Sequence, residues 1–228
     1  MKRGASQGDS HLAGVVLAGG RSERFGSPKQ YALLAGERLV DRAVRLVRHF
    51  TDLVVVALPE GRNWDGAPVH AAVTGGASRT ESVRHAMRAV PPDVEFVLVN
   101  DVIRPLASVR VVTALLDAVA AGADGAMPVW SLPDTLKVLH DDGRITHAGR
   151  EGFVVAQGPT AFRAAALRRM FDELGDIPIE ETVGIERIGG RVVGVPGDRW
   201  SHHVVEPRDL VLMERLLDLC GGENQEPG

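Results

Sequence analysis

Two glycines and two basic residues lie in one polar loop near the start of the chain. Gly19 and Gly20 end a short apolar run, and Arg24 and Lys29 follow before the next apolar segment. Consecutive glycines let the backbone approach an anionic ligand with its N–H groups turned inward, while Arg and Lys add full positive charge. The loop fits neither GxxxxGK[ST] nor GxGxxG. This combination predicts a site for the phosphates of a nucleoside triphosphate.

Apolar runs that alternate with amphipathic segments must position this loop. The run over 12–18 ends at glycine and is typical of a buried strand. Similar runs predict strands over 52–57, 69–73, 95–101 and 125–129, and helical spacing predicts helices over 40–50, 80–90 and 108–121. Such alternation predicts an α/β fold with a mostly parallel sheet flanked by helices. Ligands bind beyond the carboxyl ends of such strands, so the function is expected in the loops after Ala18, Val73, Val99 and Val129.

The pattern changes between residues 131 and 160. Residues 135–139 and 144–146 flank a turn at Gly143, which predicts a β-hairpin. The hairpin either projects from the sheet as an arm or pairs with its edge. Further patterns predict a helix over 164–174, a strand over 191–195 and a helix over 207–219. With no repeat and no linker, we expect one domain over 12–219 with an arm at about 131–160, and flexible polar tails at 1–11 and 221–228.

Composition excludes several classes of protein. The net charge is −4, so no basic excess indicates a nucleic-acid partner. Cys220 is the only cysteine, which excludes an internal disulfide framework and a cysteine-based zinc site. No apolar run approaches the ~18 residues of a membrane span, and the first residues lack the apolar core of a signal peptide. We therefore expect a soluble cytoplasmic protein.

The loop LAGGRSERFGSPKQ at 17–30 resembles the signature loop of sugar-phosphate nucleotidyltransferases. Its Pro-Lys-Gln ending is most similar to the 2-C-methyl-D-erythritol 4-phosphate cytidylyltransferase (IspD) family. Later motifs follow in the family's order: GGASRTESV at 75–83 resembles GGxxRxxSV, LVNDVIRP at 98–105 resembles LVHDAARP, DTLK at 134–137 resembles DTxK, and PRDL at 207–210 resembles PxDL. The resemblance covers residues 12–219 and implies a Rossmann-like nucleotidyltransferase fold with a projecting β-hairpin arm.

The resemblance also implies a reaction and a nucleotide site. A phosphate oxygen of the acceptor would attack the α-phosphorus of CTP and release pyrophosphate, giving a CDP-linked isoprenoid precursor. Arg24 and Lys29 would be the catalytic cations, stabilising charge on the α-phosphate and on the leaving pyrophosphate. The implied nucleotide-binding residues are Ala18, Gly19 and Gly20 around the triphosphate, and Gly75, Gly76 and Ser82 around the cytosine and ribose.

The resemblance places a metal and an acceptor on other segments. Asp101 ends a predicted strand, and Mg²⁺ usually takes one or two protein carboxylates plus phosphate oxygens, so Asp101 is the expected magnesium ligand. Arg104 either takes part in this site or tethers its loop. The expected substrate-binding residues for a phosphorylated polyol are Thr135, Lys137, Arg150 and His203. The family places such groups near a dimer interface, which implies a homodimer through the arm.

The chain departs from the family mainly on the acceptor side. His203 stands where the family has a phosphate-binding lysine, Gly158 replaces a threonine, and IEETV at 179–183 replaces TD[DE]AS. A neutral histidine offers a phosphate less charge than lysine does. The acceptor is therefore 2-C-methyl-D-erythritol 4-phosphate or a different polyol phosphate or phosphonate. A non-catalytic nucleotide-binding paralogue is a third alternative, which the retained Arg24, Lys29 and Asp101 disfavour.

Overall fold

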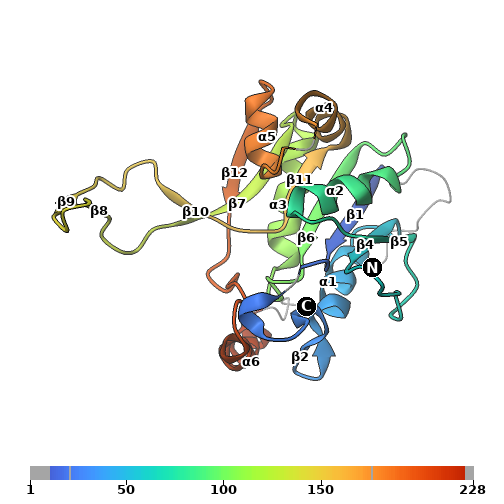
Figure 1. The fold of residues 1–228 in the computed structure, drawn as a ribbon, viewed down its shortest axis with the longest axis horizontal. Helices are drawn as coiled ribbons and strands as arrows, with labels where there is room; N and C mark the ends of the chain where they lie inside the picture. Colours follow the sequence, from blue (N-terminus) through green and yellow to red (C-terminus); the bar gives the residue numbers. More distant parts are fainter. Residues whose placement is uncertain (1–10, 21, 176, 224–228) are drawn as a thin grey trace.

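The computed structural model describes residues 11–20, 22–175 and 177–223. A central sheet with helices on both faces forms its body, and one segment projects far from it (Figure 1). The sheet contains β1 (Leu12–Leu17), β4 (Val54–Leu58), β5 (Ala71–Thr74), β6 (Phe96–Asp101), β7 (Gly125–Ser131), β10 (Val154–Ala156), β11 (Thr160–Arg163) and β12 (Val192–Pro196). The helices are α1 (Leu39–Arg48), α2 (Arg79–Arg88), α3 (Val109–Ala120), α4 (Ala164–Leu174), α5 (Glu181–Arg187) and α6 (Pro207–Glu223).

The strands run mostly parallel, as the sequence predicts. β1 pairs with β4 on one side and with β6 on the other, and β5 extends the sheet beyond β4, all in parallel register. β11 is antiparallel to both β6 and β7. β12 pairs in parallel with one edge of β7, while β10 and β11 pair with successive parts of the other edge. The α/β fold class is confirmed.

Two apolar cores cover the two faces of the sheet. Successive side chains of a strand point to opposite faces, so Val16 and Leu98 pack with α1, α3 and α6, whereas Val15 and Val97 pack with α2, α4 and α5. Strands β1 and β4 are therefore buried on both faces, which explains their continuous apolar sequence. Helix α1 lies so close to β1 that a Cβ at Gly14 would overlap the side chain of Val47.

The projecting segment is the predicted arm. β8 (Lys137–Leu139) and β9 (Ile145–His147) form a separate two-stranded sheet near its tip, joined by a turn in which Gly143 has φ +80° (Figure 1). Of the two alternatives for this hairpin, the projecting arm is the one observed. The arm is shorter than predicted, because β7 continues to Ser131 and β10 returns to the central sheet at Val154.

Several helices and strands of the structure were not predicted, and ordered structure extends further into both predicted tails than expected. The sequence gives no clear signal for β10, β11, α5 or the two-residue strands β2 (Leu33–Leu34) and β3 (Glu37–Arg38), because short segments show no resolvable period. The carbonyl of His11 accepts hydrogen bonds from Glu95 and Phe96, and α6 continues to Glu223. Residues 1–10 and 224–228 of the predicted tails lie outside the described residues. Within the described chain, no helix is both long and apolar enough to cross a membrane.

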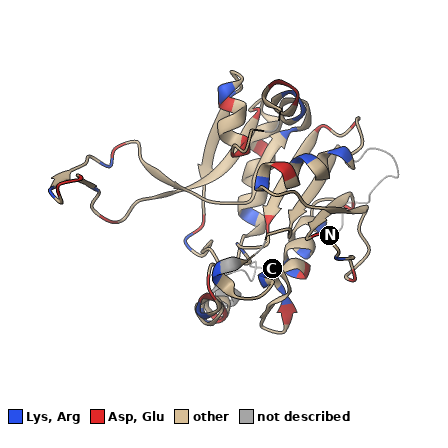
Figure 2. Ribbon diagram, in the orientation of Figure 1, with Lys and Arg blue, Asp and Glu red and all other residues tan. Residues whose placement is uncertain are grey.

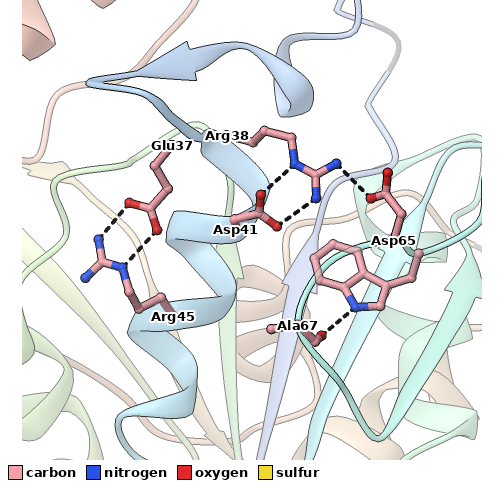
Figure 3. Close-up of polar contacts among 7 residues, drawn as sticks. Glu37, Arg38, Asp41, Arg45, Asp65 and Ala67 are labelled. Atoms are coloured by element: carbon pink, nitrogen blue, oxygen red, sulfur yellow. Dashed lines mark hydrogen bonds and ion pairs between the residues drawn. The ribbon is translucent and has the colours of Figure 1, made fainter.

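A charged cluster fixes the start of α1 (Figure 3). Arg38 donates to Asp41 at 2.5 Å and to Asp65 at 2.7 Å, which ties α1 to the loop that follows β4. Glu37 receives two hydrogen bonds from Arg45, each 2.9 Å long. Each of these side chains has its charge partner within the cluster, so we assign the cluster a structural role.

Candidate functional site

The predicted nucleotide-binding loops meet at one edge of the sheet. Leu17 pairs in register with Asp101 on one side and with Ala57 on the other, and Leu58 pairs with Thr74. The loops that follow β1 and β5 therefore leave the sheet at the same edge as the carboxyl end of β6. This brings Gly19, Gly75 and Asp101 to one edge, where ligands of such sheets bind.

The first glycines of the two pairs, Gly19 and Gly75, pack against each other. A Cβ at Gly19 would lie 3.5 Å from the Cα of Gly75, and a Cβ at Gly75 would lie 3.4 Å from the Cα of Gly19. The Ser82 hydroxyl accepts a hydrogen bond from the Gly76 N–H at 3.0 Å and donates to the Ser78 carbonyl at 2.9 Å. Ser82 thus shapes the second loop.

Ser22 closes the first loop around Lys29. Its backbone is left-handed, with φ +57°, and its hydroxyl accepts a hydrogen bond from the Lys29 N–H at 3.2 Å. The same hydroxyl lies 3.4 Å from Oε1 of the buried Gln30. The loop therefore returns on itself and sets the position of Lys29. Sequence reasoning missed Ser22 and Gln30 as supports, although Gln30 belongs to the quoted Pro-Lys-Gln ending.

Lys29 is partly buried among charged groups of both signs. Its Nζ donates to the Val204 carbonyl at 3.2 Å. Burial lowers the pKa of Lys29 below its ordinary value, the nearby charge of Arg24 lowers it further, and Asp101 and Asp209 oppose the shift. Arg24 itself is exposed on the 3₁₀ helix η1 (Glu23–Phe25). The two predicted catalytic cations thus lie near each other and near Asp101.

His203 belongs to this same cluster. Partial burial of its exposed side chain lowers the pKa of His203 below the ordinary value, and the charges of Arg104 and Lys29 lower it further, which favours a neutral imidazole. Arg104 donates to the Ser201 carbonyl at 2.5 Å and to the Ala156 carbonyl at 3.4 Å. With these contacts Arg104 tethers its loop, which is one of the two roles that the sequence left open for it. They hold the 201–203 segment beside the site.

Asp101 shares an arginine with a second carboxylate. Arg79 Nε donates to Asp101 Oδ2 at 3.0 Å, and Arg79 Nη1 forms an ion pair with the fully buried Glu181. The Asp101 side chain remains 25% exposed. Among the described residues no three His, Cys, Asp or Glu side chains cluster as a metal cage, so Asp101 fits Mg²⁺ only with phosphate oxygens as further ligands. Sequence reasoning assigned no role to Arg79 or Glu181, although Arg79 lies in the quoted GGxxRxxSV-like motif.

The remaining predicted residues lie on the arm. Thr135, Lys137 and Arg150 belong to the segment between β7 and β10, which leads away from the loops that follow β1 and β5 (Figure 1). Arg150 donates to the Pro133 carbonyl at 3.1 Å and so braces the arm across its two sides. The arm carries both basic and acidic residues (Figure 2). One chain therefore assembles the nucleotide residues and His203 but leaves these three apart.

A groove of about 1680 Å³ lies between α1, α3 and the 197–200 turn. Arg42, Arg110, Trp130 and Trp200 are among the residues that line it. Lys29 and the two glycine pairs are not among them. Arg104, which holds the 201–203 segment beside the site, does line the groove, so the groove adjoins the site at Arg104.

Residues 12–218 match the family model described as IspD: 2-C-methyl-D-erythritol 4-phosphate cytidylyltransferase. The chain belongs to this family. The match spans the sheet, both glycine loops and the arm, and it confirms the resemblance that the sequence motifs indicated. It also confirms the predicted class of enzyme, a CTP-dependent nucleotidyltransferase.

Relatives of the chain carry the same description. A 2-C-methyl-D-erythritol 4-phosphate cytidylyltransferase of Frankia casuarinae is 37% identical over 92% of this chain and 82% of that protein. One from Saccharopolyspora erythraea is 35% identical over 90% of this chain and 99% of that protein. The crystal structure of the Thermus thermophilus enzyme of this name is 30% identical with a TM-score of 0.75, covering 90% of this chain and 98% of that one.

Proposed function

We propose that the protein transfers CMP from CTP to the phosphate of 2-C-methyl-D-erythritol 4-phosphate and releases pyrophosphate. The observation that carries this proposal is the meeting of Lys29, Arg24 and the glycine loops beside Asp101 at one sheet edge. Family membership supplies the nucleotide and the acceptor. Because both substrates are phosphorylated metabolites, we place the enzyme in the cytoplasm.

The proposed reaction needs positioned charge rather than a covalent enzyme intermediate. An acceptor phosphate oxygen forms the new bond to the α-phosphorus as the bond to the bridging oxygen of the β-phosphate breaks. Backbone N–H groups of the loop at Gly19 and Gly20 hold the triphosphate. Lys29, fixed by the Val204 carbonyl, neutralises charge that builds up on the α-phosphate, and Arg24 does so on the departing pyrophosphate.

Asp101 is the side chain that would hold Mg²⁺ together with the oxygens of the triphosphate. The bound ion would neutralise phosphate charge and orient the leaving group. The Asp101 carboxylate is suited to this because it is partly exposed, ends β6 and lies near Lys29.

We propose that the acceptor site is completed by the arm of a second copy. The arm exposes apolar side chains that a monomer would leave in water: Leu139 is 73% exposed, Ile145 61% and Phe153 61%. Contiguous exposed apolar surface marks interaction sites. A two-fold symmetric exchange of arms would cover these residues and bring Thr135, Lys137 and Arg150 to the partner's nucleotide loops.

Analytical ultracentrifugation tests the dimer. The wild-type protein is expected to sediment as a dimer and Leu139→Glu as a monomer with little turnover, because a charge on an exposed side chain disrupts an interface without disturbing the core. Val211→Glu, at an exposed position on α6, is the matched control. A wild-type monomer with full activity would contradict the proposed exchange of arms.

His203, in place of the family's lysine and with a lowered pKa, favours a second candidate, transfer to a different polyol phosphate or a phosphonate. Pyrophosphate release measured over four nucleoside triphosphates and a panel of such acceptors separates the two. We expect CTP with 2-C-methyl-D-erythritol 4-phosphate to give the highest kcat/KM, and His203→Lys to lower the KM for that acceptor. A higher kcat/KM with another acceptor establishes the second candidate. Absence of turnover with every pair contradicts both.

A further inference from the structure

Arg79 connects the candidate metal ligand to a buried part of the fold. It begins α2, and its Nε donates to Asp101 at the end of β6 while its Nη1 pairs with Glu181 at the start of α5. The neighbouring Thr80 hydroxyl donates to the Ile179 carbonyl at 2.5 Å. Two adjacent residues of α2 are thus anchored to the 179–181 segment. These contacts fix the position from which the Arg79 side chain reaches Asp101.

Glu181 determines how the charge of Arg79 is shared. Its side chain is 0% exposed, and Arg79 is the ionic partner that the structure gives it. An ionised carboxylate buried without a partner is strongly disfavoured, so Glu181 keeps the guanidinium in place. The carboxylates of Asp101 and Glu181 thus share one guanidinium, and Lys29 is a further cation near Asp101. The arginine can therefore fix Asp101 by a hydrogen bond without cancelling its charge.

We propose that Arg79 and Glu181 form a positioning pair that presents the Asp101 carboxylate, still anionic, to the cation bound with the triphosphate. Neither residue touches substrate. Arg79 sets the direction of the carboxylate, and Glu181 neutralises Arg79 from the side remote from the site. This inference rests on the proposed function, because it assumes the metal role of Asp101.

The first test measures cation binding rather than turnover. Glu181→Gln keeps the shape of the side chain and removes its charge, so Arg79 then neutralises Asp101 more fully. With CTP present, binding of Mn²⁺ measured from the electron paramagnetic resonance of the free ion is expected to weaken by about tenfold. The apparent Mg²⁺ requirement for pyrophosphate release rises to the same extent, while kcat at saturating Mg²⁺ stays within about threefold of wild type. Glu186→Gln, an exposed change on the same helix, is the matched control.

The second test separates charge from position. The double variant R79Q/E181Q lacks both charges of the pair, so Asp101 keeps its own charge but loses its support. Affinity for Mn²⁺ is expected to match or exceed that of wild type, whereas kcat falls by about tenfold or more. If Glu181→Gln alone fails to fold, as followed by thermal unfolding, this double variant decides: wild-type kcat in it overturns the proposal.

Asp101→Asn distinguishes the failure of this inference from that of the proposed function. If Asp101→Asn binds Mn²⁺ and turns over like wild type, the metal role of Asp101 is wrong. If Asp101→Asn loses both properties while Glu181→Gln binds Mn²⁺ as tightly as wild type and Glu186→Gln, the positioning pair alone is wrong.

Discussion

Replacing Lys29 with Met tests the central assignment, because it removes the charge and keeps the length of the side chain. In the free protein Lys29 makes one charged hydrogen bond, to the Val204 carbonyl at 3.2 Å, in a partly buried position. Bonds to charged groups contribute about 1.5–3 kcal/mol. Burial opposes the charged form, as the lowered pKa shows, so methionine recovers part of that loss. We therefore expect the free energy of unfolding to change by no more than about 1 kcal/mol.

The effect on catalysis is expected to be several times larger. A positioned donor that stabilises charge developing in the transition state contributes about 10²–10³ in kcat, or about 2.7–4 kcal/mol. Steady-state pyrophosphate release from CTP and 2-C-methyl-D-erythritol 4-phosphate measures this loss, and thermal unfolding measures stability on the same samples. Arg48→Met, at an exposed cation on α1, is the control and is expected to leave both unchanged.

The pH dependence gives an independent check on the same side chain. Burial and Arg24 lower the pKa of Lys29, so kcat/KM of the free enzyme should decline on the alkaline side at a lower pH than an ordinary lysine would give. Lys29→Arg keeps the charge and should move this decline to higher pH. If Lys29→Met retains turnover within about threefold of wild type, the assignment of Lys29 to the α-phosphate is refuted.

Two further predictions concern the scaffold. Asp209 accepts backbone hydrogen bonds from residues 205 and 206, which lowers its pKa. Asp209→Ala should therefore lower the free energy of unfolding at neutral pH by about 1 kcal/mol more than Asp218→Ala on the same helix does. Because the folded pKa lies below the unfolded one, denaturant titrations should show this difference disappearing as pH falls through the folded pKa, and a pH-independent difference would contradict it. Gly14→Ala should cost about 1–3 kcal/mol because its methyl group overlaps Val47, and G14A/V47A should recover part of that cost in thermal unfolding if the overlap is the cause.

Much of the site can be located from residue types and local pattern. Gly19 and Gly20 end an apolar run, Asp101 ends another, and the rule that parallel sheets bind ligands beyond their strand ends places both at one edge. Arg24 and Lys29 are predictable as phosphate-binding cations because they follow such a glycine pair. The supports are not predictable in this way. Ser22 functions through a left-handed backbone conformation that polar residues adopt in many loops without any role.

The sequence by itself determined the class of the fold, the arm and the loops that carry the nucleotide chemistry, because apolar periodicity and turn residues are local properties of the chain. Only the tertiary structure decided which distant groups meet. Arg79 reaches Asp101 and Glu181 across three separate elements, and Gly19 approaches Gly75 from a different loop. The order of strands in the sheet determines which of these residues come into contact. That order follows from packing of the whole core, which no single segment of the chain encodes.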